Sequence, residues 1–352
     1  MKRILFVLAF IALAVGGFYA MSSAFKGAKE GAKKGWEENC YTCDKDEDSS
    51  KELQTEAAEV DDSKAESDAV MVKNETVESD AASDYSPAMW KIEHNGKTSY
   101  LFGSIHVGDK SMYPLPQKVM DAFAASEALA VEADITKVDQ MQMAQTVQQL
   151  ALDLENPLPT VLSEKTKAKY DVFCETQTAT CNMVKVFEPW MAALTIEVMG
   201  VMKAGYSEEL GVDKFFIRGA ENKEIVELES VDGQLKMLDQ MPKELQDFMV
   251  LGAISKDADD VENLMIAWKT GQLDEFMQQA EQDAKDLGVS EEIANQFNEI
   301  FLYKRNQVMA DGIADLINSG KSVFAVVGAA HYAGENSVNQ YLEAKGFKIE
   351  RI

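Results

Sequence analysis

The sequence predicts an α/β fold over residues 87–352, with a mixed central sheet flanked by helices and a helical insertion or lid. Strand-like and helical segments alternate near both ends of this region, which is typical of a sheet covered by helices. Two β-prone runs are joined by Asn95-Gly96, a pair that tolerates the positive φ angles of a tight hairpin turn. Residues 232–318 are rich in Met and Leu at helical spacing, and we expect them to form the helical insertion.

Periodicity and turn residues predict the individual elements of this domain. The expected strands are residues 89–94, 97–102, 128–133, 224–228, 321–327 and 347–352. The expected helices outside the insertion are residues 117–125, 139–152, 164–176, 188–203, 211–220 and 335–345.

The first 24 residues are expected to be a signal peptide or an N-terminal membrane anchor. Lys2 and Arg3 precede seventeen uncharged residues that end at Ala20, the pattern of an export signal. The same length is at the lower limit for crossing a bilayer, so an uncleaved anchor is the alternative. In both cases the basic start stays in the cytoplasm. We therefore expect an exported protein that is periplasmic, or anchored in the inner membrane and facing the periplasm.

An acidic linker is expected at residues 25–86. Residues 37–86 contain seventeen Asp or Glu and four Lys, and tyrosine is the only aromatic residue there. Such a composition buries too little apolar surface to fold and predicts disorder. The whole chain has a net charge of −26, and no basic cluster follows residue 36. Nucleic acid is therefore not an expected partner.

The four cysteines form two local pairs, Cys40 with Cys43 and Cys174 with Cys181. Two disulfides are the simple interpretation in an oxidising compartment. A redox Cys-x-x-Cys and a four-cysteine zinc site are the alternatives. The acidic surroundings of the first pair disfavour the former, and the long separation of the pairs disfavours the latter.

The motif that points to a functional site is Gly-x-x-His directly after an apolar strand. This motif occurs twice. It places His106 after residues 97–102 and His331 after residues 321–327. Open α/β sheets bind ligands at the carboxyl ends of their strands, so both imidazoles are expected at one edge. The chain has one other histidine, His94, which we expect to face solvent in the hairpin.

Two carboxylates end other predicted strands, Glu132 and Glu229. A carboxylate joining two imidazoles is a common site for a catalytic divalent metal, which polarises a carbonyl and activates water. We expect His106, His331 and Glu132 to bind zinc, manganese or cobalt. Glu132 or Glu229 is then the catalytic base.

Other polar residues have weaker signals. Asp134 and Asp213 lie where helix N-terminal turns often carry Asp. Arg305 and Asn306 lie in a mostly polar helix, where a solvated face and a role in the site are both open interpretations. No nucleophile elbow, phosphate-binding loop, dinucleotide fingerprint or His-Glu-x-x-His motif competes with this site.

At these residues the chain resembles the TraB/GumN family, which includes the Tiki metalloproteases of animals and is related to the ChaN and erythromycin-esterase-like proteins. The resemblance covers about residues 88–352, and the paired Gly-x-x-His motifs are its most specific part. The matching segments are Trp90, Tyr100–Gly108, Ala130–Asp134, Pro189–Met191, Gly211–Asp213, Glu227–Ser230 with Gln234, Arg305-Asn306 with Met309, Val327–Glu335 and Gly346-Phe347.

The resemblance implies a mixed-sheet α/β fold whose active centre combines the two motif histidines with a glutamate. Carried over to this chain, these are His106 and His331, and Glu132 best matches the glutamate. Ala330 stands where the second motif of the family usually has a glycine. The Tiki branch implies a metal-dependent hydrolase, and a peptidase in particular. A haem- or metal-binding protein without activity and a peptide-sequestering protein are the alternatives, and the substrate does not transfer.

Overall fold

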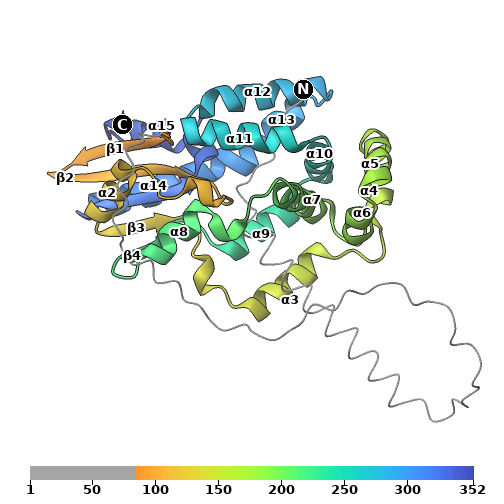
Figure 1. Ribbon diagram of the computed structural model, residues 1–352, viewed down its shortest axis with the longest axis horizontal. Coiled ribbons are helices and arrows are strands. Elements are labelled where there is room, and N and C mark those ends of the chain that lie inside the picture. The colour runs from red at the N-terminus through yellow and green to blue at the C-terminus, as the bar shows by residue number, and fades with distance from the viewer. Residues whose placement is uncertain (1–84) are drawn as a thin grey trace, which may run out of the picture. The chain divides into compact units, whose positions relative to one another are not determined.

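The computed structural model describes residues 85–352, which form a six-stranded mixed sheet with helices on both faces and a helical part beside it (Figure 1). The strand order is β4-β3-β5-β2-β1-β6. The predicted α/β class with a mixed central sheet is therefore confirmed. The strands are β1 (Met89–His94), β2 (Lys97–Ser104), β3 (Ala128–Val131), β4 (Glu224–Glu227), β5 (Val323–Gly328) and β6 (Ile349–Arg351).

The strand pairing brings three carboxyl ends together. β5 lies between β3 and β2 and is parallel to both, and β3 is also parallel to β4. The register pairs Ser104 with Gly328 and Val131 with Val326, so β2, β5 and β3 end side by side. β1 is antiparallel to β2 and to β6, which makes the sheet mixed.

The predicted hairpin is present between β1 and β2. Its two turn residues, Asn95 and Gly96, have φ angles of 49° and 77°, the left-handed values that a two-residue turn needs. His94 is not simply solvent-facing as expected, because its ring packs against Phe347 with 5.1 Å between ring centroids.

Alternating residues of the strands point to opposite faces of the sheet, and each face is covered. Leu101 and Ala325 pack in one core cluster, and Phe102 and Phe324 pack in the other. Helices α14 (Lys304–Asn318) and α15 (Val338–Ala344) cover the first face, and α2 (Gln117–Ala125) and α8 (Val212–Gly219) cover the second.

A second group of helices lies beside the sheet (Figure 1). Its centre is α7 (Pro189–Lys203), which is buried on nearly all sides because its residues are apolar around the whole helix. The other helices are α3 (Gln140–Ala151), α4 (Leu158–Val161), α5 (Glu164–Thr176), α6 (Thr178–Val184), α9 (Val231–Asp239), α10 (Lys243–Ala253), α11 (Ala258–Thr270), α12 (Leu273–Asp286) and α13 (Glu291–Asn298). The expected insertion at 232–318 thus forms α9 to α14, although α14 packs on the sheet.

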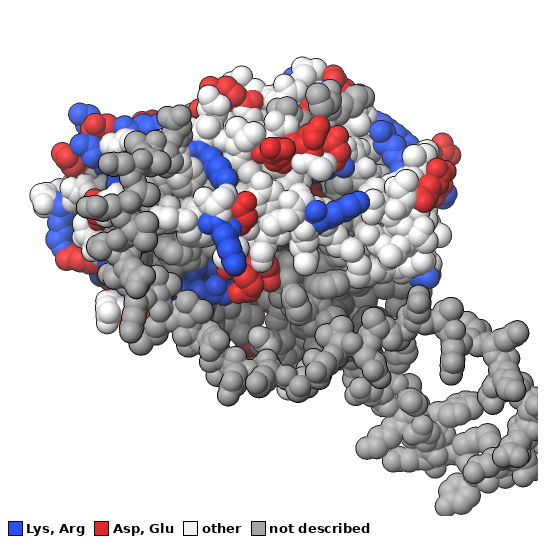
Figure 2. All heavy atoms as spheres, viewed as in Figure 1, with Lys and Arg blue, Asp and Glu red and all other residues white. Residues whose placement is uncertain are grey.

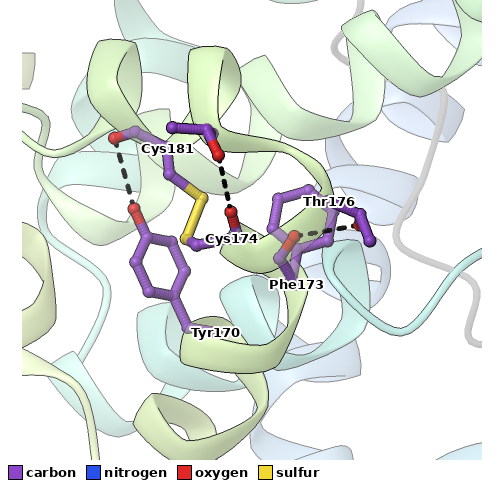
Figure 3. Close-up of a disulfide and its surroundings, with 6 residues drawn as sticks. Tyr170, Phe173, Cys174, Thr176 and Cys181 are labelled. Carbon is purple, nitrogen blue, oxygen red and sulfur yellow. Dashed lines mark hydrogen bonds between the residues drawn. A yellow bond between two sulfur atoms is a disulfide. The ribbon is translucent and has the colours of Figure 1, made fainter.

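A disulfide joins Cys174 in α5 to Cys181 in α6, as the spacing predicted (Figure 3). The Tyr170 hydroxyl donates to the Cys181 carbonyl at 3.4 Å, and the Thr178 hydroxyl donates to the Cys174 carbonyl at 3.0 Å. The predicted pair Cys40 and Cys43, the segment 1–24 and nearly all of the linker 25–86 lie outside the described residues.

Within residues 85–352, no helix combines the length and apolarity that crossing a bilayer requires. On the face shown in Figure 2, lysine and arginine side chains lie scattered among acidic ones, and those that are visible form no continuous basic stripe.

Candidate functional site

The ends of three parallel strands bring His106, Glu132 and His331 together. Oε1 of Glu132 lies 3.8 Å from Nε2 of His106 and 3.9 Å from Nε2 of His331. All three residues are buried, and His331 has no exposed surface. The sequence prediction that both motif histidines and Glu132 occupy one edge of the sheet therefore agrees with the geometry.

The carboxylate of Glu132 is fixed by one backbone donor and two side-chain donors, of which Gln234 is the more distant at 3.4 Å. The amide of Gly328 donates to Oε1 at 2.6 Å, and Nη2 of Arg305 donates to Oε2 at 2.8 Å. Gly328 is closely surrounded here, because a Cβ would lie 3.1 Å from Oε1 of Glu132, a tight contact, and 3.7 Å from Nε2 of His106. The glycine of the second motif thus keeps open the space between the donors.

Each imidazole is held through its Nδ1 atom. Nδ1 of His331 lies 2.6 Å from Oδ1 of Asn306, in the first turn of α14. Nδ1 of His106 lies 3.1 Å from Oδ2 of Asp213, as an ion pair rather than a well-aligned hydrogen bond. Among the described residues, neither Nε2 atom has a hydrogen-bond partner, although both are buried. Metal-binding histidines show this arrangement, because an acceptor on one ring nitrogen orients the other toward the ion.

The position of Asp213 depends on a close backbone approach at Gly211. A Cβ on Gly211 would lie 2.5 Å from the carbonyl oxygen of His106, so a larger residue does not fit. The neighbouring amide of Val212 donates to the Ile105 carbonyl at 2.8 Å. This contact begins α8 beside the first motif and places the Asp213 side chain against His106.

Arg305 links Glu132 to the second predicted carboxylate, Glu229. Its Nε lies 2.9 and 3.0 Å from the two oxygens of Glu229, and Nη2 lies 2.6 Å from Oε2. Gln234 at the start of α9 also donates to Oε2 of Glu229, at 2.9 Å. Both Glu229 oxygens are therefore engaged by Arg305, which favours a positioning role over that of a base.

A π-helical turn, Glu299–Tyr303, precedes α14 and places Arg305 in this network. Nη1 of Arg305 donates to the Phe301 carbonyl within that turn at 3.2 Å. Such turns shift the helical phase by one residue and often occur at functional sites. Arg305 and Asn306 follow this turn in the first turn of α14, and both are buried.

The two histidines have opposite electrostatic environments. Burial lowers the pKa of His106, but the charge and hydrogen bond of Asp213 outweigh it and raise that pKa to about 9. Burial and the nearby charge of Arg305 lower the pKa of His331 well below its ordinary value. At neutral pH His331 is therefore neutral, which is the form in which imidazole binds a metal, whereas His106 carries a proton that a metal ion would have to displace.

The donor set fits a divalent ion in chemistry, although its spacing is wide. Donors about 2.1 Å from a tetrahedral ion lie about 3.4 Å from one another. The observed 3.8 and 3.9 Å are a few tenths of an ångström larger. Within residues 85–352, no group of three His, Cys, Asp or Glu is arranged as a ready metal cluster. An inward movement of a few tenths of an ångström would bring each of these two distances to the spacing that an ion requires.

Sequence reasoning placed some site residues correctly and missed others. Arg305 and Asn306 are 5% and 1% exposed, so the solvated-face interpretation is wrong for both. The exposed Lys304 separates them from the apolar segment Ile300–Tyr303, so the local sequence gives no clear signal that Arg305 and Asn306 are buried. Asp134 does not join the site, because its side chain caps the short helix Ile135–Lys137 and pairs with Lys137.

Comparison with known proteins identifies relatives over most of the described region. The chain is 24% identical to the uncharacterized protein YbaP of Shigella flexneri over 251 residues, covering 69% of this chain and 87% of that protein. It is 23% identical to YbaP of Escherichia coli K12 over 250 residues, with the same coverage. An uncharacterized protein of Treponema pallidum is 24% identical over 153 residues, covering 42% of this chain and 45% of that protein.

No solved structure shows a significant match to this chain. The model of the TraB/PrgY/gumN family matches residues 88–351, which include all of the described sheet and both Gly-x-x-His motifs. The match extends over about three quarters of the chain, and the chain therefore belongs to the TraB/PrgY/gumN family.

Proposed function

We propose that this protein is a metal-dependent hydrolase of the cell envelope, with peptides as the first substrate class to test. The observation that carries the proposal is the pair of buried Nε2 atoms on His106 and His331, which face Oε1 of Glu132. A buried polar atom without a partner destabilises the fold, so its retention suggests a ligand. A divalent cation is the group that two imidazoles and one carboxylate bind together.

The surrounding residues have distinct proposed roles. Asp213 and Asn306 hold the Nδ1 atoms and so fix the direction of each Nε2 atom. Arg305 compensates the buried charges of Glu132 and Glu229 and keeps the Glu132 carboxylate aligned. The ion would supply Lewis acidity to a carbonyl and lower the pKa of a water molecule. Glu132 is the proposed third ligand or base.

The test is the metal content of the full chain after reloading with zinc, manganese and cobalt in turn. We expect one equivalent in the wild-type chain and none in the His106→Ala/His331→Ala variant. A His94→Ala variant is the matched control, because His94 lies in the β1–β2 hairpin and takes no part in the site. Equal metal content in the double variant and the wild-type chain would refute the shared site.

The assay that follows separates catalysis from binding alone. Peptide libraries are incubated with the loaded protein, and we expect cleavage that is lost with the double variant. A haem-binding protein would instead give a Soret band that His331→Ala removes, without hydrolysis. Bound but intact peptide would identify a sequestering protein.

A further inference from the structure

A cavity of about 590 Å³ lies in the helical part of the protein. Its walls come from the end of α5, from α6, the second half of α7, the start of α11, and α12. None of its lining residues belongs to the site at the strand ends. Cavities of 300 to 1,000 Å³ with mostly apolar walls and a few polar groups are typical of small-molecule sites.

The cavity has apolar walls interspersed with polar side chains, and one ion pair lies among them. Phe173, Leu264 and Phe276 are among its apolar lining residues. The pair joins Nζ of Lys256 to Oε1 of Glu197 at 2.6 Å, and the Glu197 side chain is only 4% exposed. Burial raises the pKa of Glu197, and Lys256 opposes this shift.

Two further carboxylates line the cavity but serve the helix itself. Asp257 and Asp260 form the capping box of α11, each accepting from the backbone amide of the other. Lys203 also lines the cavity and is exposed. Two charges of the cavity wall remain, namely the buried carboxylate of Glu197 and the ammonium of Lys256, whose side chain is 21% exposed.

One wall of the cavity is held by the disulfide described above. Thr176, Gln177 and Thr180 line the cavity and lie between Cys174 and Cys181 in the sequence. Figure 3 shows this cross-link between the end of α5 and α6. A wall fixed in this way is preformed, which reduces the entropy lost when a ligand binds.

We propose that this cavity binds a small apolar zwitterion, namely an apolar amino acid or dipeptide. The ligand ammonium contacts Glu197, its carboxylate contacts Lys256, and its side chain lies against the phenylalanine and leucine walls. A bound zwitterion would replace the Glu197–Lys256 ion pair with two ion pairs, one between its ammonium and Glu197 and one between its carboxylate and Lys256. A lone cation would have to compete with Lys256 for Glu197. A lone anion would draw Lys256 away and leave the buried Glu197 carboxylate without this partner, which is strongly unfavourable.

The first test uses the wild-type full chain and a matched ligand series in isothermal titration calorimetry. Leucine, phenylalanine and leucyl-leucine are the probes. Leucinamide lacks the carboxylate charge, N-acetyl-leucine lacks the ammonium, and glycine lacks the apolar side chain. We expect binding of the three probes and at least tenfold weaker binding of each altered analogue. Absence of binding by every probe at millimolar concentration overturns the proposal, as does binding of leucinamide or N-acetyl-leucine as tight as that of leucine.

The second test locates the site with variants. Glu197→Gln and Lys256→Met should each weaken leucine binding at least tenfold. Lys243→Met is the matched control, because Lys243 pairs with Glu188 at the start of the same helix α7 and does not line the cavity. Circular dichroism melting confirms that each variant is folded. Unchanged affinity in both cavity variants refutes this location, and metal content should be unaffected in all of them.

Discussion

Replacing Arg305 by methionine tests whether the buried charge network holds the site together. The side chains of Glu132 and Glu229 are 7% and 13% exposed, and Arg305 donates to both. Removing one partner of a buried ion pair typically destabilises a protein by about 3–5 kcal/mol. Each carboxylate keeps another donor, Gly328 for Glu132 and Gln234 for Glu229. We therefore expect a loss near the lower end, about 3 kcal/mol.

Urea denaturation followed by circular dichroism measures this loss. With a denaturant slope of about 3 kcal/mol per molar, the midpoint should fall by about 1 M. The urea midpoint of Arg305→Lys should lie between those of the wild-type chain and Arg305→Met. An ammonium keeps the positive charge but lacks the several N–H donors with which the guanidinium bridges both carboxylates. Glu229→Gln combined with Arg305→Met should destabilise less than the sum of the single changes. A midpoint shift below about 0.3 M for Arg305→Met would refute the reasoning.

Three further predictions test the site and the helical part. Gly328→Ala should lower metal affinity at least about tenfold while the protein stays folded, because its methyl group enters the space between the donors; unchanged affinity contradicts this. Gly211→Ala should destabilise the chain by about 1–3 kcal/mol in urea, since its Cβ meets the His106 carbonyl; a loss within error argues against the close approach. Because burial raises the pKa of Glu197, the folded state binds more protons than the unfolded state. The stabilisation that protonated Glu197 provides is full below the unfolded-state pKa and is lost as pH rises through the folded-state pKa. The stability of Glu197→Gln relative to wild type should therefore increase between pH 4 and pH 7, and a constant difference would count against it.

The fold class and the core of the site followed from short-range patterns, because strand ends and Gly-x-x-His motifs are local features. His106, Glu132 and His331 were expected together since parallel strands end at one edge of a sheet. The residues that orient them come from helices whose phase depends on packing. Asn306 contacts His331 from a helix that follows a π-helical turn, which single-sequence periodicity does not reveal.

The short helices show the same limit. α4 and α6 have four and seven residues, too few for a helical period to stand out from the surrounding polar sequence. The role of Asp213 likewise depends on the approach of Gly211 to the backbone of His106, a contact between segments more than one hundred residues apart.

The central position of β5 has a consequence for the order in which this protein is assembled. β5 is the fifth strand in the sequence, yet it lies between β3 and β2 in the sheet. During synthesis, β2 and β3 therefore have facing edges that stay open until residues 323–328 emerge. The same strand carries Gly328 and leads to His331, so the centre of the sheet and the geometry of the candidate site form in one late step. A chain that ends before residue 323 exposes unpaired strand edges and is prone to aggregate.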